Sequence, residues 1–351
     1  MSCYHPYLAV VKSNPITGDP ILDPKTGKKC IKILHKISPS NDVLSDNLKQ
    51  NNMLLLPCGQ CIGCRLDYSR RWADRLMLEL QYHTAAIFVT LTYSELNVPK
   101  HHYQTPDGDV NTSYSLDKRD VQLFFKRLRK MYPDTKIRFF LSGEYGPKTF
   151  RPHYHAIIFG VDFAHDRYVW RVRRADNMFV NYYRSPSLER AWSVYNNDVG
   201  DYVPIGNVEF SDVSWHTCAY VARYVTKKLT GNLAQFYTTF NLTPPFSLMS
   251  RKPGIAYQYY ADHGLDIYDN DKINISTERG GLSMLPPKYF DHFYELDAPD
   301  DYVNYKSVRA ALARESLLLK LDQSTLSYGQ MLAVAESIKN NKIKSLDRSE
   351  V

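Results

Sequence analysis

The sequence predicts an α+β fold in which helices flank a central antiparallel β-sheet. Residues 86–93 are rich in β-branched and aromatic side chains, which is typical of a strand. Residues 117–131 place apolar side chains three and four positions apart, which predicts a helix with one apolar face. Apolar runs at 137–141 and 153–159 indicate two more strands, and a second helical pattern follows near 214–229. This order of elements favours a sheet with helices packed on it.

The residues at the element ends agree with these predictions. Ser115 or Asp117 is a suitable N-cap for the first helix, and Pro133 ends it. Gly231 is a natural stop for the second helix. We therefore expect an N-terminal extension with a cysteine cluster at 1–84 and a core at 85–261 with a basic, aromatic insertion near 161–213. A C-terminal extension at 262–351 has helical patterns near 305–320 and 325–341 and no motif that assigns it a role.

The composition sets broad limits on function. Hydrophobic residues make up 44% of the 351 positions, which is enough for a substantial core. A net charge of +7 favours a polyanionic partner only weakly. No run of 18 apolar residues occurs, and the first 30 residues lack the apolar segment of a signal peptide. We therefore expect no membrane association and a reducing cytoplasm.

Two histidines and a glutamate form the first candidate site. His153 and His155 lie two apart on a predicted strand, so their side chains share one face. Glu144 follows the preceding strand and would lie near both histidines if the strands are antiparallel neighbours. Two imidazoles and a carboxylate predict a Mg²⁺ or Mn²⁺ site with positions left open for phosphate and water. The alternative is a pair of ordinary strand histidines and a solvated carboxylate.

Two tyrosines on the second predicted helix form the next candidate site. Tyr220 and Tyr224 are four apart, so they lie one above the other, and Lys227 continues the same face. A metal-polarised phosphate could be attacked by a phenol to give a covalent phosphotyrosine. The chain has 27 tyrosines, so a pair at this spacing is by itself more often packing than catalysis.

The combination of these segments resembles a known family. The strand at 88–93, the His-Tyr-His strand at 153–155 and the helix with Tyr224-x-x-Lys227 occur in the order found in HUH endonucleases. The similarity is greatest to replication initiators of microviruses, especially the gokushovirus-like group of single-stranded DNA phages. Those proteins share segments like 1–6, 57–65 and 250–255, and the resemblance covers roughly residues 1–261.

This resemblance implies a rolling-circle initiator with an HUH endonuclease-like fold. Such a protein nicks the phage origin, retains the 5′ end on tyrosine, and later rejoins the displaced strand. The resemblance implies Tyr220 and Tyr224 as nucleophiles with Lys227 nearby, and His153, His155 and Glu144 as metal ligands. The expected partners are single-stranded and origin duplex DNA. Because no P-loop motif is present, a host helicase and polymerase in the bacterial cytoplasm are expected as well.

Two further clusters have both a functional and an ordinary interpretation. Cys58, Cys61 and Cys64 would hold a structural Zn²⁺ if Cys3 or Cys30 supplied the fourth thiolate, and otherwise they are free thiols. The insertion interleaves charge with aromatic rings, which suits single-stranded DNA but also fits a solvated loop. The residues singled out there for DNA binding are Trp170, Arg171, Arg173 and Arg174.

Two rival functions stay open from the sequence. The same scaffold serves plasmid relaxases and HUH transposases, against which the cysteine triplet and the start of the chain argue. A rival of another class is a non-catalytic, metal-stabilised nucleic-acid-binding protein, in which both tyrosines would be buried and unreactive.

Overall fold

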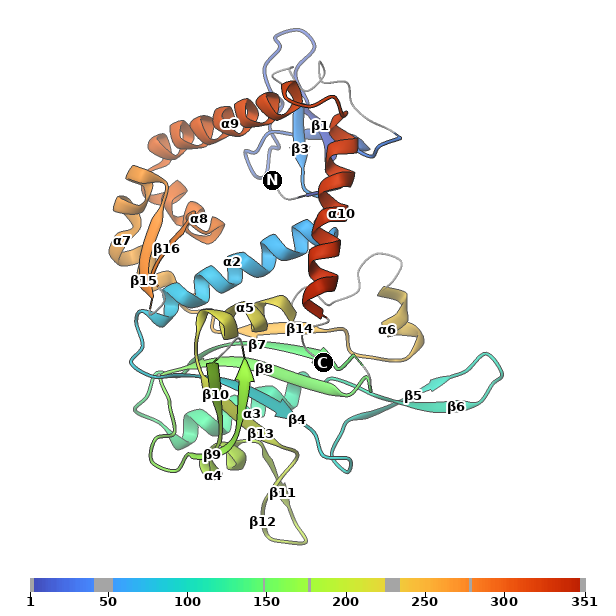
Figure 1. Ribbon diagram of the computed structural model, residues 1–351, viewed down its shortest axis with the longest axis vertical. Coiled ribbons are helices and arrows are strands. Elements are labelled where there is room, and N and C mark those ends of the chain that lie inside the picture. Colours follow the sequence, from blue (N-terminus) through green and yellow to red (C-terminus); the bar gives the residue numbers. More distant parts are fainter. Residues whose placement is uncertain are drawn as a thin grey trace. The chain divides into compact units, whose positions relative to one another are not determined.

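The computed structural model describes residues 3–40, 53–147, 149–175, 178–224, 234–277 and 280–347 (Figure 1). The chain divides into two compact units. One unit is Tyr68–Asp291, and the other combines Met1–Asp67 with His292–Val351. The helices α2 (Ile62–Leu80) and α8 (Lys288–Asp297) each contain a boundary between the units.

The unit Tyr68–Asp291 is built on a seven-stranded sheet in the order β14-β7-β8-β4-β13-β10-β9. All neighbouring strands pair antiparallel, which confirms the predicted α+β class. The strands are β4 (Ala86–Thr92), β7 (Arg138–Tyr145), β8 (Pro152–Phe159), β9 (Tyr168–Ala175), β10 (Met178–Arg184), β13 (Val208–Asp212) and β14 (Phe246–Met249).

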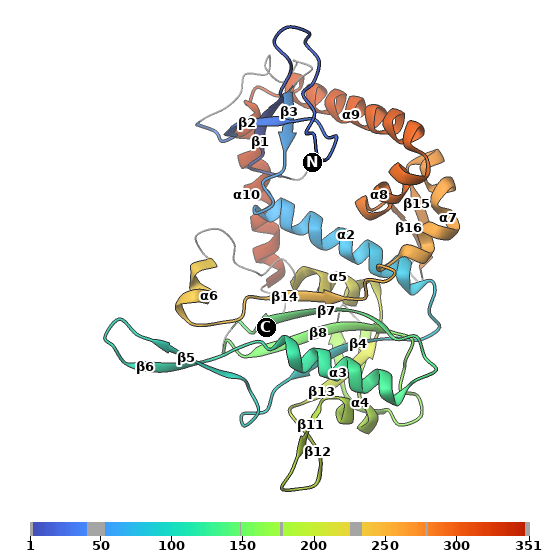
Figure 2. The same cartoon turned by 180° about the vertical axis from the view of Figure 1, so that it is seen from behind.

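The same unit holds three separate two-stranded hairpins and five helices. The hairpins are β5 (Lys100–Gln104) with β6 (Val110–Tyr114), β11 (Ser193–Asn196) with β12 (Asp201–Pro204), and β15 (Ile273–Thr277) with β16 (Gly280–Met284). The helices are α3 (Lys118–Met131), α4 (Pro186–Ala191), α5 (Trp215–Tyr224), α6 (Gln235–Thr239) and α7 (Tyr257–Asn270). Figures 1 and 2 both show α3 and α4 on one face of the large sheet and α5 on the other.

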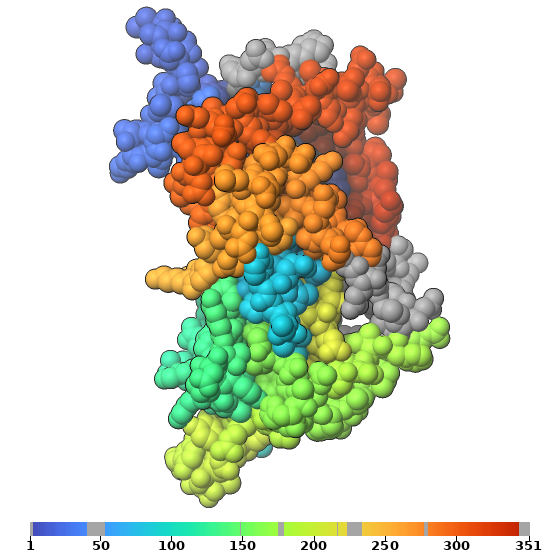
Figure 3. Space-filling view, turned by 90° about the vertical axis from the view of Figure 1, so that its left-hand side faces the viewer, coloured from blue at the N-terminus to red at the C-terminus, as the bar shows by residue number. Residues whose placement is uncertain are grey.

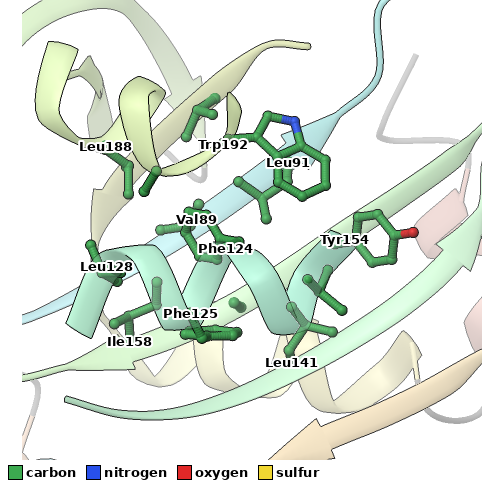
Figure 4. Close-up of a cluster of buried hydrophobic side chains, with 14 of the residues drawn as sticks. Val89, Leu91, Phe124, Phe125, Leu128, Leu141, Tyr154, Ile158, Leu188 and Trp192 are labelled. Atoms are coloured by element: carbon green, nitrogen blue, oxygen red, sulfur yellow. The ribbon is translucent and has the colours of Figure 1, made fainter. Parts of the chain in front are cut away.

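The first face of the sheet carries the main hydrophobic core, with α3 packed on it (Figure 4). This helix begins at the predicted N-cap Asp117, whose carboxylate accepts a hydrogen bond from the backbone N–H of Arg119 at 2.6 Å. Phe124 and Leu128 lie on its buried stripe and contact strand residues such as Val89. Spacing by three and four therefore predicted both the helix and the face that it buries.

A buried ion pair anchors the segment between β14 and α7. The Glu79 carboxylate is only 5% exposed and accepts hydrogen bonds from Arg138 and from the backbone N–H of Ala256. Arg138 also donates to the carbonyl oxygens of Pro253 and Gly254, at 3.1 and 2.9 Å. Arg75 donates to the Ile255 carbonyl at 2.8 Å. One network of side chains thus fixes the loop backbone to α2 and β7.

The second unit has a three-stranded antiparallel sheet in the order β2-β1-β3. Its strands are β1 (Tyr7–Val11), β2 (Ile31–Lys36) and β3 (Met53–Leu56), and its long helices are α9 (Pro299–Asp322) and α10 (Tyr328–Asp347). The buried cluster is small and consists of Leu8, Ile37 and Tyr328. Gly329 lies so close to Ser38 that an added Cβ would be 2.6 Å from its carbonyl oxygen.

Several elements differ from the sequence predictions. The strand predicted at 137–141 continues through Tyr145, so Glu144 lies within β7 instead of after it. The predicted insertion contributes three strands of the large sheet, and β13 lies in its interior next to β4. The predicted helix stop Gly231 lies outside the described residues. The three-part division of the chain at 84 and 261 stays a prediction.

Candidate active site

The register of the central strands aligns polar side chains on the α5 face of the sheet. His155 pairs with Thr90 on one side and with Ser142 on the other. His153 pairs directly with Glu144. Because paired residues in an antiparallel sheet point to the same face, both histidines and Glu144 share one face. The intervening Tyr154 points to the opposite face and joins the core.

His155 is held by contacts on several sides. Its Nε2 lies 3.3 Å from Glu144 Oε1, and its Nδ1 lies 3.1 Å from Thr90 Oγ1. The ring is stacked over Phe88, with 5.9 Å between centroids and 7° between planes. His155 and Glu144 are 7% and 4% exposed. The imidazole and the carboxylate therefore meet in a largely buried setting with fixed orientations.

The hydrogen bond of His153 determines which ring nitrogen is available. Its Nδ1 lies 2.7 Å from the carbonyl oxygen of Arg151, and a carbonyl can only accept. Nδ1 must therefore carry the proton, which leaves the lone pair on Nε2. Burial lowers the pKa of His153 below its ordinary value, with a further contribution from nearby His155. A neutral ring with one fixed N–H is the form that binds metal ions.

The donor set fits a divalent ion in part. Ligands at 2.0–2.1 Å in octahedral geometry lie about 3 Å apart, close to the 3.3 Å between His155 Nε2 and Glu144 Oε1. The ligand atom of His153 is not gathered with them to the same extent. Among the described residues, only Cys3, Cys58, Cys61 and Cys64 bring three or more such atoms within 4.8 Å of one another. His153 would complete the set after rotation of its side chain.

Helix α5 places a tyrosine beside this pair. The Tyr220 ring lies 5.5 Å from the His155 ring and 5.8 Å from the Phe88 ring, edge-on to both. Buried Cys218 and Val221 fix the inner side of the helix, while Tyr220 is 38% exposed. The tyrosine thus lies at the edge of the site and is open to a polymeric substrate.

The other two residues predicted on this helix are described less fully. Tyr224 is the last residue of α5, one helical turn after Tyr220, and the structure describes its backbone only. Lys227 lies outside the described residues. Their roles therefore stay predictions.

The predicted DNA-binding insertion forms the β9–β10 hairpin at the edge of the sheet, drawn in green in Figure 3. The Arg171 guanidinium lies 4.7 Å from the Tyr182 ring centroid, and Arg184 lies 3.8 Å from that of Trp170. Arg173 lies 5.8 Å from the same Tyr182 ring. Trp170 is 50% exposed, so cations and an open aromatic surface occur together.

The hairpin and the histidine site share one face of the sheet. Arg171 forms an ion pair with Glu209 of β13. Glu209 pairs with Thr90, and Thr90 pairs with His155. This row runs from β8 to β9 through residues that point the same way. Arg174 pairs with Phe179 instead, next to the pair formed by Arg173 and Val180, so it lies on the opposite face from Arg173.

Sequence reasoning did not identify three supporting residues of the site. Thr90 and Phe88 hold His155, and Glu209 connects the site with the hairpin. The strand at 86–93 alternates, so Phe88 and Thr90 could have been assigned to one face. Strand β13 had not been predicted, so nothing indicated the position of Glu209.

Comparisons with known proteins agree with one another. The family model described as replication-associated protein ORF2 matches residues 86–229. The replication-associated protein ORF2 of Spiroplasma virus 4 is 30% identical over 329 residues, which cover 92% of this chain and 94% of that protein. The replication-associated protein VP4 of Bdellovibrio phage phiMH2K is 28% identical and covers 71% of this chain and 70% of its own length.

The remaining comparisons add two limits. The replication-associated protein ORF4 of Chlamydia phage 1 is 32% identical over 49% of this chain and 38% of its own length. No solved structure matches the chain. Within the described part of the chain, none of the helices has the length and apolar character needed to span a membrane.

Proposed function

This chain belongs to the replication-associated protein family of the microviruses, and on that premise we propose that it is a metal-dependent nicking endonuclease for single-stranded DNA. A role in phage DNA replication follows from the family. The chemistry is our proposal, and one observation carries it: Tyr220 lies edge-on to His155, 5.5 Å away, beside the pair formed by His155 and Glu144.

The proposed cofactor is Mg²⁺ or Mn²⁺, held by His155, Glu144 and a rotated His153. A bound divalent ion would polarise the scissile phosphate and neutralise the charge that develops on it. The Thr90 hydroxyl and the Arg151 carbonyl would fix the orientations of the two imidazoles.

In the proposed reaction the Tyr220 phenol releases its proton and its oxygen attacks the scissile phosphorus. A bond forms between the tyrosine oxygen and phosphorus, and the bond between phosphorus and the 3′ oxygen breaks. The 3′ oxygen takes up a proton and leaves as a hydroxyl that a host polymerase can extend. The 5′ phosphate remains on Tyr220 until a 3′ hydroxyl attacks it and rejoins the strand. The number of phosphodiester bonds is conserved, so neither step needs an external energy source.

Tyr224 is the proposed second nucleophile, since one helical turn separates it from Tyr220. A second tyrosine permits a second transfer while the first covalent bond persists. Lys227 is proposed to assist ionisation of a phenol, on the basis of its spacing in the sequence.

The proposed substrate path runs along the α5 face from Tyr220 to the β9–β10 hairpin. Bases stack on rings such as Trp170 and Tyr182, while Arg171 and Arg184 meet phosphates. An origin duplex would have to be opened first, for which we propose a host helicase in the bacterial cytoplasm. Half-exposed rings beside guanidinium groups suit an unpaired strand better than a closed duplex.

The test is a covalent trapping assay. Oligonucleotides that tile the phage origin and carry a label 3′ of each candidate nick are incubated with protein and Mn²⁺. We expect labelled protein on a denaturing gel, and no label with EDTA or with His155→Ala. If the two tyrosines act singly, Tyr220→Phe and Tyr224→Phe each retain part of the adduct and the double variant has none.

Tyr195→Phe is a suitable control because this tyrosine is also exposed but lies in the β11–β12 hairpin. Binding without any adduct on a complete origin tiling would reject the nuclease and favour the non-catalytic binding protein. Cleavage that requires a conjugative transfer origin or transposon ends instead of the phage origin would favour a relaxase or a transposase.

A further inference from the structure

Four cysteines from separate parts of the sequence meet in the unit that contains the N-terminus. The sulfur atoms of Cys3, Cys58, Cys61 and Cys64 all lie within 4.8 Å of one another. Cys3 and Cys61 have a sulfur–sulfur distance of 3.9 Å, and all four are free thiols. Zinc–sulfur bonds of about 2.3 Å in a tetrahedron place neighbouring sulfurs about 3.8 Å apart. We propose that these residues form a mononuclear tetrathiolate zinc site.

The backbone around the cysteines supports thiolate ligands. The N–H groups of Tyr4 and Cys58 donate to Cys61 Sγ and Cys3 Sγ, at 3.3 and 3.2 Å. The N–H group of Cys61 donates to Cys58 Sγ at 3.3 Å. Hydrogen bonds to sulfur stabilise the negative charge of a metal-bound thiolate, and such outer contacts are usual around metal sites.

The local chain geometry explains how one short segment supplies three ligands. Gly59 has a φ of +73°, a conformation that L side chains rarely adopt, and it turns the chain between Cys58 and Cys61. Cys64 follows in the first turn of α2 (Ile62–Leu80). The fourth ligand is Cys3, which is 1% exposed, and not Cys30, the alternative left open by the sequence.

The size of the surrounding core gives the site a reason to exist. The buried cluster of this unit contains only Leu8, Ile37 and Tyr328 among the described residues. Strand β2 buries little, since Ile33 is 55% exposed. A small core stabilises a unit poorly, and structural metals are one way to compensate. A metal that joins Cys3 to Cys58 closes a loop between residues 55 positions apart and holds the small sheet at the start of α2.

The test measures metal and thiol state without reference to nicking. The full chain, purified under reducing conditions without chelator, is expected to contain about one zinc per molecule. Replacement by Co²⁺ is expected to give intense visible bands and a sulfur-to-cobalt charge-transfer band. Cys58→Ser and Cys61→Ser should lose the metal, whereas Cys30→Ser, a free thiol of the same unit, should retain it.

Wild-type protein provides a readout that survives misfolding of the variants. With zinc bound, alkylation followed by mass spectrometry should spare the four cluster cysteines, and removal of zinc should make them reactive. His153→Ala/His155→Ala should keep its zinc, so failure of the nuclease proposal and failure of this one are distinguishable. Substoichiometric metal with no Co²⁺–thiolate bands, an iron–sulfur spectrum, or unchanged zinc in Cys58→Ser would each overturn the proposal.

Discussion

Replacing Glu79 by Gln removes one charge from the buried pair with Arg138 and leaves the shape of the side chain almost unchanged. The two side chains are 5% and 8% exposed, so the Arg138 charge would remain in a setting with little water. Loss of one partner of a buried ion pair typically costs about 3–5 kcal/mol of folding free energy. We expect a loss of this size, because Ala256 also loses the acceptor of its 2.6 Å hydrogen bond.

The pH dependence of this effect has a definite sign. Burial by itself raises the pKa of Glu79, but hydrogen bonds from His83, Arg138 and the Ala256 N–H outweigh it and lower the pKa below the ordinary 4.5. A lowered pKa in the folded state means that the ionised form stabilises the fold. The contribution is fully present above the unfolded pKa near 4.5 and is lost as the pH falls through the folded value. The difference between wild type and Glu79→Gln should therefore shrink in acid.

The assay is urea unfolding of wild type, Glu79→Gln, Arg138→Met and the double variant at neutral and acidic pH. We expect the double variant to lose less stability than the sum of the single losses, because it leaves no unpaired buried charge. Glu95→Gln is the control, since its partner Arg151 is bound at an exposed site and the unfolding midpoint should hardly move. Additive single effects, or a Glu79→Gln loss below about 1 kcal/mol, would refute the reasoning.

Three further predictions test other parts of the structure. Thr90→Val removes the 3.1 Å contact with His155 Nδ1 but keeps the branched shape, so half-maximal nicking should need about 10-fold more Mn²⁺ or above; an unchanged metal titration would contradict this role. Trp170→Ala should weaken single-stranded DNA binding by about 1–3 kcal/mol in fluorescence anisotropy, whereas Val172→Ala, an exposed aliphatic residue of the same strand, should have little effect. Phe124→Ala should destabilise the fold by about 3–5 kcal/mol in denaturant, because this ring is fully buried in the main core; a loss below about 1 kcal/mol would show that the core tolerates the cavity.

Local patterns were enough to predict the central strands and the first helix. Helix α3 begins after Asp117 and buries Phe124 and Leu128, as the spacing of its apolar residues requires. Strand β8 pairs with β7, and the two histidines share a face because side chains alternate along a strand. These features depend on neighbours in the sequence, so the sequence by itself determined them.

Features that depend on distant pairing were not predictable in the same way. The pairing of Glu209 with Thr90 and its ion pair with Arg171 depend on β13 entering the sheet between β4 and β10. Likewise, the sequence left Cys3 and Cys30 equally suitable as the fourth thiolate, and only the fold brings Cys3 to the triplet.

The sequence thus determined which residues carry the chemistry, since alternation along strands and helical spacing are local properties of the backbone. The tertiary structure decided which of them meet. Tyr220 lies beside His155 because buried residues of α5 dock on β7 and β8, and that contact joins segments 65 positions apart in the chain. Such contacts form only when apolar surfaces from distant segments are removed from water together, and no local pattern records which surfaces those are.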